Sequence, residues 1–206
     1  MLSALKKIIN KLCRPSINKR LQQRLKNHEM SVISSNCNGA LILHDLNQAF
    51  RSPFVNLYLE PSDFIRYLKN MQEYNAQTLT FIPSDKSYPI GKLGDITLHF
   101  MHYHSEEEAK TKWESRLKRI NLNNLFIIMT DRDGATYQDL KEFNELPFKN
   151  KIVFTHKPYP EFSSSFYIKG FDNSSQVGDL FDFSGWNGQK YYDQFDYVNW
   201  FNQENT

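Results

Sequence analysis

An apolar run that ends in two aspartates constrains the fold of this chain more than any other feature. Leu125–Thr130 reads Leu-Phe-Ile-Ile-Met-Thr, and Asp131, Asp133 and the turn residue Gly134 follow. A short apolar run bounded by a turn signal is typical of a strand that is buried on both faces. Open α/β sheets bind ligands beyond the carboxyl ends of such strands, so we expect both aspartates at a ligand site.

The chain from residue 30 onward alternates between strand and helix patterns. We expect strands at 31–34, 55–59, 79–82, 95–103, 125–130, 151–155 and 166–168, and helices at 40–50, 61–74, 106–119, 136–144 and 191–201. Strands that alternate with helices of about ten residues imply βαβ units. The sequence therefore predicts a single-domain α/β fold of 206 residues, Rossmann-like and three-layered, with helices on both faces of a mainly parallel sheet.

The helix expected after Ser105 has the clearest local start signal. Ser105 can act as an N-cap and Glu108 lies three residues later, which is the spacing of a capping box. Ala109, Trp113 and Leu117 follow at intervals of four, so we expect these side chains to face the core.

The N-terminal segment 1–28 forms a basic arm. It holds eight of the 25 basic residues and no acidic one, so the other 17 basic side chains face 23 acidic ones and the body has a net charge of −6. Leu2, Leu5, Ile8, Ile9 and Leu12 recur at helical spacing, and we expect Pro15 to end that helix. We therefore divide the chain into an amphipathic arm, 1–29, and an α/β domain, 30–206.

The arm allows more than one interpretation. A cationic amphipathic helix can lie in the interface of an anionic membrane. It can equally pack on its own domain and leave its charges in water. We expect no nucleic-acid partner, because the arm has no recognised nucleic-acid motif and no interleaved aromatic residues.

Cysteine usage and hydropathy bear on location. Cys13 and Cys37 show no spacing typical of a disulfide framework or a zinc site, which favours a reducing, cytoplasmic location. The N-terminus lacks the features of a secretory signal, and no stretch approaches the roughly 18 apolar residues that span a bilayer. We expect a cytoplasmic protein, with peripheral attachment to the inner face of the plasma membrane as the role of the arm.

The aspartate pair indicates metal or diphosphate chemistry. Carboxylates at a strand end can hold Mg²⁺ or Mn²⁺, which neutralises the diphosphate of a substrate. An apolar strand followed by Asp-x-Asp resembles the metal-binding signature of nucleotide-sugar glycosyltransferases. We therefore assign Asp131 and Asp133 as metal ligands and give Asp133 a catalytic role. The alternative is that Asp131 caps the turn and that Asp133 and Gly134 are ordinary turn-forming residues.

Further candidate residues lie in polar loops. Asn36 and Cys37 follow the first expected strand and open a helix, where backbone amides can receive an anion and a thiol can become nucleophilic. His44 is a candidate general base, with its orienting acid supplied from elsewhere. His102 and His104 share a strand face and could bind metal, or be half-buried strand residues. We assign four more residues to substrate binding: Lys92, Asp95, Arg132 and Asp179. Each loop also fits an ordinary turn.

Five segments together resemble a bacterial family. They are Ile33–Cys37, Ser52–Leu57, Tyr88–Asp95, Met129–Gly134 and Gln176–Asp179. The sequence is similar to a domain of unknown function that is often labelled exopolysaccharide-biosynthesis protein and is found among capsule and cell-envelope genes. The resemblance spans about residues 30–200 and leaves the arm outside. It implies an α/β fold and a role in making surface polysaccharide, without an established set of catalytic residues.

These observations lead to one expected function and two alternatives. We expect a transferase that moves a sugar from a nucleotide sugar to a glycan or a lipid-linked glycan, assisted by Mn²⁺ or Mg²⁺. O-acyl transfer from an acyl donor to a glycan hydroxyl, with His44 as the base, is the first alternative. A non-catalytic protein that binds a glycan or a partner is the second.

Overall fold

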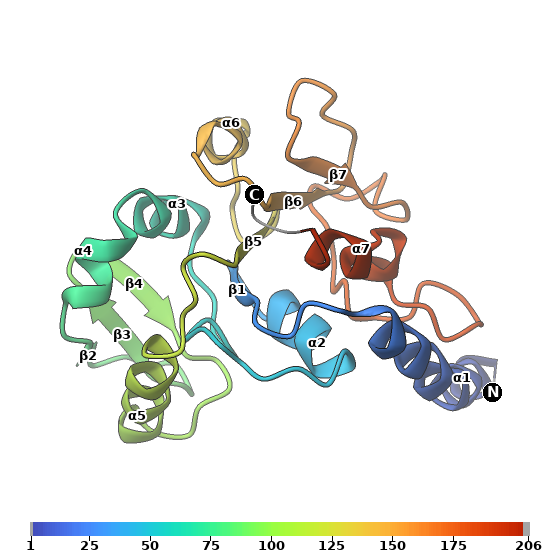
Figure 1. The fold of residues 1–206 in the computed structure, drawn as a ribbon, viewed down its shortest axis with the longest axis horizontal. Helices are drawn as coiled ribbons and strands as arrows, with labels where there is room; N and C mark the ends of the chain where they lie inside the picture. The colour runs from blue at the N-terminus through green and yellow to red at the C-terminus, as the bar shows by residue number, and fades with distance from the viewer. Residues whose placement is uncertain (1, 204–206) are drawn as a thin grey trace.

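The computed structural model describes residues 2–203 (Figure 1). Four parallel strands form the main sheet in the order β1-β5-β6-β7, and three antiparallel strands form a small sheet in the order β2-β3-β4. The strands are β1 Ser31–Ser34, β2 Thr80–Ile82, β3 Ile90–Leu93, β4 Ile96–His99, β5 Leu125–Thr130, β6 Lys151–Thr155 and β7 Ser165–Tyr167. The helices are α1 Leu2–Arg24, α2 Asn38–Asp45, α3 Pro61–Lys69, α4 Met71–Ala76, α5 Glu106–Leu117, α6 Tyr137–Glu145, the 3-10 helix η1 Tyr191–Gln194 and α7 Tyr197–Phe201.

Strand β5 is the central element, as the sequence predicts. It pairs in parallel with β1 on one side and with β6 on the other, and all six of its residues are buried. Ile127 and Met129 join one hydrophobic cluster, whereas Phe126 and Ile128 join a second cluster on the opposite face. Because successive side chains of a strand point to opposite faces, the sheet is covered on both sides. The predicted three-layer α/β class is confirmed.

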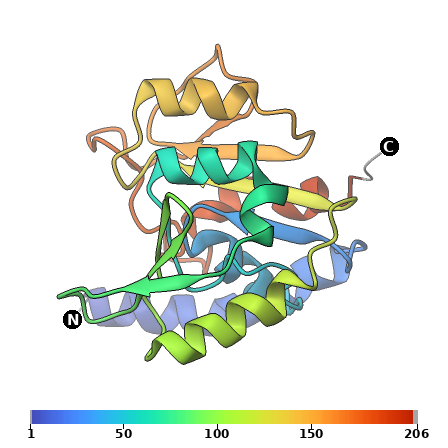
Figure 2. The ribbon, with the colours of Figure 1, turned by 90° about the vertical axis from the view of Figure 1, so that its left-hand side faces the viewer.

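Two different layers cover the two faces of the main sheet. Helices α3, α4, α5 and α6 and the small sheet share the first cluster, and they lie on one side of the strands in Figure 1. Helices α2 and α7 and the end of α1 share the second cluster on the other side. Figure 2, viewed from the side of the small sheet, shows that sheet with α3, α4 and α5 in front of the parallel strands.

Several predicted elements differ from the structure. Residues 55–59 form no strand and contribute only a single bridge between Tyr58 and His99. The predicted loop at 88–95 contains β3 of the small sheet. The predicted helix 61–74 is broken at Asn70, and the predicted helix 191–201 is η1 followed by α7. The two apolar side chains of β3, Ile90 and Leu93, are three residues apart, so this strand shows no alternation of period two.

Helix α5 begins where the sequence predicts. The Ser105 hydroxyl accepts a hydrogen bond from the Glu108 amide, and Trp113 is buried against Phe54 and Phe100. The Glu108 carboxylate accepts from the amide of His104, rather than from the amide of Ser105 as a complete capping box requires.

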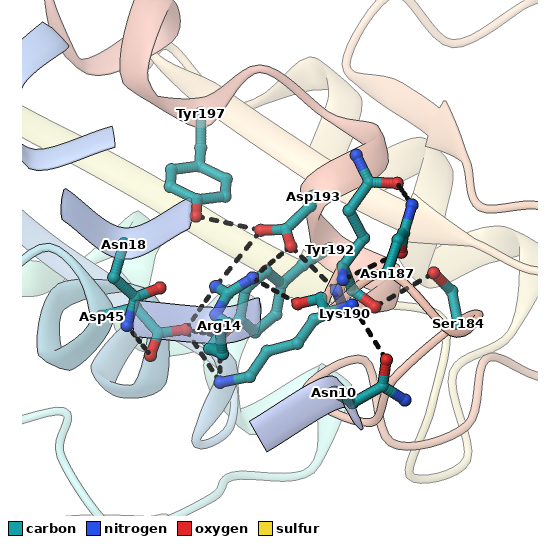
Figure 3. Close-up of polar contacts among 12 residues, drawn as sticks. Asn10, Arg14, Asn18, Asp45, Ser184, Asn187, Lys190, Tyr192, Asp193 and Tyr197 are labelled. Carbon is teal, nitrogen blue, oxygen red and sulfur yellow. Dashed lines mark hydrogen bonds and ion pairs between the residues drawn. The ribbon is translucent and has the colours of Figure 1, made fainter. Parts of the chain in front are cut away.

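The predicted end of α1 at Pro15 is wrong, because the helix continues to Arg24. Arg14, just before the proline, is buried and pairs with Asp45 at 2.6 Å and with Asp193 (Figure 3). Asn18, just after it, donates to Asp45 at 3.1 Å. Pro15 is exposed, and so is Lys11, the residue whose carbonyl loses its helical donor. Tertiary bonds on both sides of the proline therefore hold the helix together.

Candidate functional site

A cavity of about 640 Å³ opens beyond the carboxyl ends of β1 and β5, where the sequence predicts a ligand site. Its walls combine amide, carboxylate, guanidinium and aromatic groups. The lining residues are Asn36, Cys37, Asn38, Leu41, Asn56, Tyr58, Tyr88, Met101, His102, Arg132, Asp133, Asp179 and Phe181. A cavity with mixed apolar walls and a few polar groups is the usual form of a small-molecule site.

Charged groups occupy one wall of the cavity. Arg132 donates a hydrogen bond to the Asp179 carboxylate, and its Nε lies 3.7 Å from Oδ1 of Asp133. Burial lowers the pKa of Arg132, but the hydrogen bond and the charge of Asp179 outweigh that effect and raise the pKa above its ordinary value. The wall therefore presents one permanent cation between two carboxylates. The carboxylates can accept hydrogen bonds from vicinal hydroxyls, and the guanidinium could bind a phosphate in exchange for its ion pair with Asp179.

Three polar side chains connect the strand ends to α2. Asn36 donates to the Thr130 hydroxyl at 2.8 Å and lies 3.5 Å from Oδ2 of Asp133. Its own Oδ1 accepts from the side chain of Asn38 at 2.9 Å. The buried Oδ1 of Asn38 has no hydrogen-bond partner among the described residues. An unsatisfied buried acceptor is costly, so this oxygen is an energetic cost that the fold bears next to the cavity.

Two lining residues hold an unusual backbone conformation. Asp133 has φ 63° and Asn56 has φ 61°, both in the left-handed region that side chains other than glycine rarely adopt. Such conformations collect at ligand sites, where the surrounding structure enforces them.

Aromatic side chains also line the cavity. Tyr58 stacks on His99 with ring centroids 4.3 Å apart, and backbone bonds between the two residues join this loop to the small sheet. Burial and then the hydrogen bond with Tyr88 raise the pKa of Tyr58 to about 12. The remaining apolar surface comes from Met101 and Phe181, which are both partly exposed. These rings offer flat apolar faces beside the polar wall.

The two predicted metal ligands point in different directions. Asp131 is almost fully buried and lies outside the cavity lining, whereas Asp133 is within it. One oxygen of Asp131 accepts from the Val177 amide at 2.8 Å, and the other accepts from the His156 amide at 2.7 Å and contacts the His156 ring nitrogen Nδ1. Asp131 therefore ties the end of β6 and the loop that carries Asp179 to the end of β5.

The geometry does not bring the aspartate pair together around one ion. No group of three or more histidine, cysteine, aspartate or glutamate side chains is placed to hold a metal within residues 2–203. Mg²⁺ and Mn²⁺ prefer several oxygen ligands. Of the predicted pair, only Asp133 has a carboxylate directed at the cavity, and Asp179 is the second carboxylate available there.

Three other predicted residues lie away from the cavity. His44 is exposed in the last turn of α2, at the far end of that helix from Cys37. Lys92 lies on β3 and donates to the Thr97 hydroxyl at 2.7 Å, and Asp95 bonds to Arg66 and Tyr74. The structure therefore separates these three from Asn36, Cys37, Arg132, Asp133 and Asp179, which it brings together.

Cys37 lies at the helix start but is not an activated thiol. Burial and, next, the negative charge of Asp133 raise its pKa to about 11. A nucleophilic cysteine needs a lowered pKa, so this environment does not support the predicted nucleophile. The thiol contributes to the wall of the cavity, 3.9 Å from the carbonyl oxygen of Leu57.

Sequence reasoning missed several residues of the site. The sequence does not single out Asn56, Tyr58 or Phe181, and it does not identify His156 as the partner of Asp131. Asn56 lies within one of the five segments that carry the family resemblance, so that segment was a usable signal. The interpretation of 55–59 as a strand concealed it.

All five of those segments contribute to the one cavity. Ile33–Cys37 supplies Asn36 and Cys37, and Met129–Gly134 supplies Arg132 and Asp133. The other three segments supply Asn56, Tyr88 and Asp179. Segments that are far apart in the sequence therefore converge on a single site.

Comparison with known proteins finds similarity over nearly the whole chain. A protein of Haemophilus influenzae, named only as an uncharacterized protein, is 63% identical over 198 residues, which are 96% of each chain. No helix among residues 2–203 is long and apolar enough to cross a bilayer. Residues 8–202 match a family described as a domain of unknown function, so the family unit includes most of α1, which the sequence analysis left outside. The chain belongs to this family, DUF1919.

Proposed function

We propose that the protein is a transferase of bacterial surface-polysaccharide synthesis that moves a sugar from a nucleotide sugar to a hydroxyl of a glycan or lipid-linked glycan. The observation that carries this proposal is the convergence of the five resemblance segments on one cavity. Its chemistry supports a carbohydrate ligand. Carboxylate and amide groups can hydrogen-bond vicinal hydroxyls, and aromatic faces can cover the C–H face of a sugar ring.

The charged wall supplies the groups that such a reaction needs. Asp133 would accept the proton of the acceptor hydroxyl as its oxygen forms a bond to the anomeric carbon. The bond from that carbon to the diphosphate breaks, and Arg132 would stabilise the negative charge on the departing nucleoside diphosphate. Asn36 is placed to orient Asp133, because its side chain amide lies 3.5 Å from that carboxylate.

A divalent ion is a separate part of the proposal. Mn²⁺ or Mg²⁺ would neutralise the diphosphate, but Asp131 cannot serve as its ligand without losing its bonds to Val177 and His156. Asp133 and Asp179 would be its available carboxylates, at the expense of the ion pair between Arg132 and Asp179.

We infer that the reaction takes place in the cytoplasm, at the inner face of the plasma membrane, where a lipid-linked acceptor would be reached. The basic segment 1–28 supports this location, because it carries eight basic and no acidic side chains.

A second candidate is O-acyl transfer to a glycan hydroxyl. The observation in its favour is that His102 lines the cavity, where it could act as the base that the sequence assigned to His44. A site that binds a glycan without chemistry is the third candidate and uses the same aromatic and amide walls.

Thermal unfolding with ligands distinguishes these functions. Purified protein would be heated with nucleotide sugars, with and without Mn²⁺, with acyl-CoA and with oligosaccharides alone. A ligand at 100 times its dissociation constant adds about 2.7 kcal/mol to the free energy of unfolding. Glycosyl transfer predicts a shift with a nucleotide sugar, and product formation once an acceptor is added.

Two variants test the residues. Asp133→Asn should weaken nucleotide-sugar binding or abolish transfer, whereas Glu145→Gln, the same charge change at an exposed residue of α6, should leave both unchanged. A shift with acyl-CoA alone would favour acyl transfer, and a shift with oligosaccharide alone would favour the binding protein. Wild-type behaviour of the Asp133 variant would reject the proposed mechanism.

A further inference from the structure

Helix α1 has one face turned toward the body and an opposite face that is unoccupied. Asn10 and Arg14 are buried, and Leu25, directly after the helix, belongs to the core. Leu5 lies nine residues before Arg14, about 2.5 turns at 3.6 residues a turn, so it projects from the opposite side. The helix is therefore held on the body by one face only.

The outward face carries a stripe of large aliphatic side chains. Leu5 is 50% exposed, Ile8 is 56% exposed and Leu12 is 73% exposed. Their spacings of three and four place them in one row along the helix. Single exposed apolar residues are ordinary, but a contiguous row on one helix face marks an interaction surface. The body leaves Leu5, Ile8 and Leu12 uncovered, so of the two interpretations of the arm, packing on its own domain does not account for these three side chains.

Charge identifies what this surface binds. Lys11 is exposed at the side of the stripe. Lys19, seven residues or about two turns after Leu12, is exposed on the same side of the helix as the stripe, and Arg20 is exposed next to it. The segment 1–28 contains no acidic side chain that would neutralise them. A second copy of the same face would bring like charges together. A bilayer with anionic lipids offers both an apolar interior for the stripe and negative charge for the lysines.

The helix is fixed to the body, so the surface has a defined orientation. Arg14 pairs with Asp45 and Asp193, and Lys190 also bonds to Asp45 at 2.8 Å (Figure 3). Asn10 exchanges two bonds of 2.8 Å with the turn that contains Gly185 and Gly188. The same turn exposes Trp186, a residue type enriched at membrane interfaces, beside the N-terminal half of α1.

We propose that the outward face of α1, formed by Leu5, Ile8 and Leu12 with Lys11, Lys19 and Arg20, binds the surface of a bilayer that contains anionic lipids. Arg14 keeps the opposite face on the body, so the domain is carried to the membrane without release of the helix. This inference rests on the proposed function for the location at the membrane, but lipid binding itself requires no catalysis. Its test therefore fails or succeeds independently of the transferase assay.

Sedimentation of the full-length protein with vesicles tests the surface. One set of vesicles would contain phosphatidylcholine alone, and the other would also contain phosphatidylglycerol, each at low and high salt. Wild-type protein should sediment with the anionic vesicles at least tenfold better than with the neutral ones, and high salt should reduce the difference. Equal binding to both vesicle types, or no binding, would overturn the proposal.

Variants separate the two contributions. A variant with Leu5→Ser, Ile8→Ser and Leu12→Ser should keep the wild-type melting temperature and lose at least tenfold in binding. A matched control with Ile82→Ser and Leu122→Ser removes exposed apolar side chains elsewhere and should bind as the wild type does. Lys11→Gln with Lys19→Gln should weaken binding about fivefold for each charge removed. Undiminished binding by the stripe variant, or a wild-type dimer that the stripe variant converts to monomer, would reject the membrane as the partner.

Discussion

The two aspartates that follow β5 should respond in opposite ways to the same substitution. Asp131→Asn and Asp133→Asn each remove one charge and keep the shape of the side chain. Asp131 is buried with a side chain only 3% exposed, and its two oxygens accept from Val177 and His156. Asp133 is 29% exposed, and its closest side-chain partners lie at 3.5 and 3.7 Å. The first should be a stability variant and the second a ligand-binding variant.

The bonds of Asp131 set the magnitude of the effect. Asparagine retains one acceptor oxygen and replaces the other by a donor, so either the Val177 amide or the His156 donors lose their acceptor. A hydrogen bond to a charged group contributes about 1.5–3 kcal/mol, and an unsatisfied buried donor costs about 1–3 kcal/mol. We expect Asp131→Asn to lower the free energy of unfolding by about 2–4 kcal/mol. For a domain of this size that is a fall of roughly 4–16 °C in melting temperature.

Asp133→Asn should cost less than about 1 kcal/mol, because it breaks only long contacts and asparagine tolerates the positive φ at this residue. Urea denaturation and thermal unfolding of both variants and the wild type would measure the difference. If Asp131→Asn proves no less stable than Asp133→Asn, the role of Asp131 as a clamp between strand ends is refuted.

Further predictions concern the α1 contacts and the cavity thiol. Arg14→Met should lower the free energy of unfolding by about 3–5 kcal/mol in urea denaturation, because it leaves the buried carboxylates of Asp45 and Asp193 short of a cation. Gly188→Ala should destabilise by about 1–3 kcal/mol, since φ is +81° and a Cβ would lie 2.8 Å from that of Cys13. Burial raises the pKa of Asp45, but bonds from Lys190 and Tyr192 and the charge of Arg14 outweigh it, so the pKa lies below 3.8. Its stabilising contribution is thus complete above about pH 4 and declines as the pH falls through the lower folded pKa, and Asp45→Asn should flatten this acid decline in unfolding measured against pH. In a Cys13→Ser background, Cys37 should react with iodoacetamide at pH 8 about a hundredfold more slowly than a thiol of pKa 9, because its own pKa is about 11. A rate equal to that of free cysteine would contradict the burial of Cys37.

The location of the cavity could be predicted from the sequence, whereas the residues that line it could be predicted only in part. Parallel strands place their carboxyl ends at one edge, so Asn36 after β1 and Asp133 after β5 had to lie near one another. Tyr58 and Phe181 lie in irregular segments with no periodic pattern. Their positions depend on a bridge to the small sheet and on the long loop after β7, which local sequence does not encode.

The predictions for the arm divide in the same way. Its charge and the helical spacing of its apolar residues are properties of the sequence alone. Which residues face the body depends on Asp45 and Asp193, which are 31 and 179 residues from Arg14. The bonds of Arg14 and Asn18 carry the helix past Pro15, against the local preference of proline.

The sequence by itself therefore determined the α/β class, the buried central strand β5, the start of α5 and the basic character of the segment 1–28. Each follows from hydrophobic periodicity, capping chemistry or charge, which act between near neighbours. The tertiary structure decided that Asp133 faces the cavity while Asp131 is enclosed by His156 and Val177, and that Leu5, Ile8 and Leu12 face outward. These outcomes depend on which distant groups satisfy a buried charge, and only the assembled fold supplies those groups.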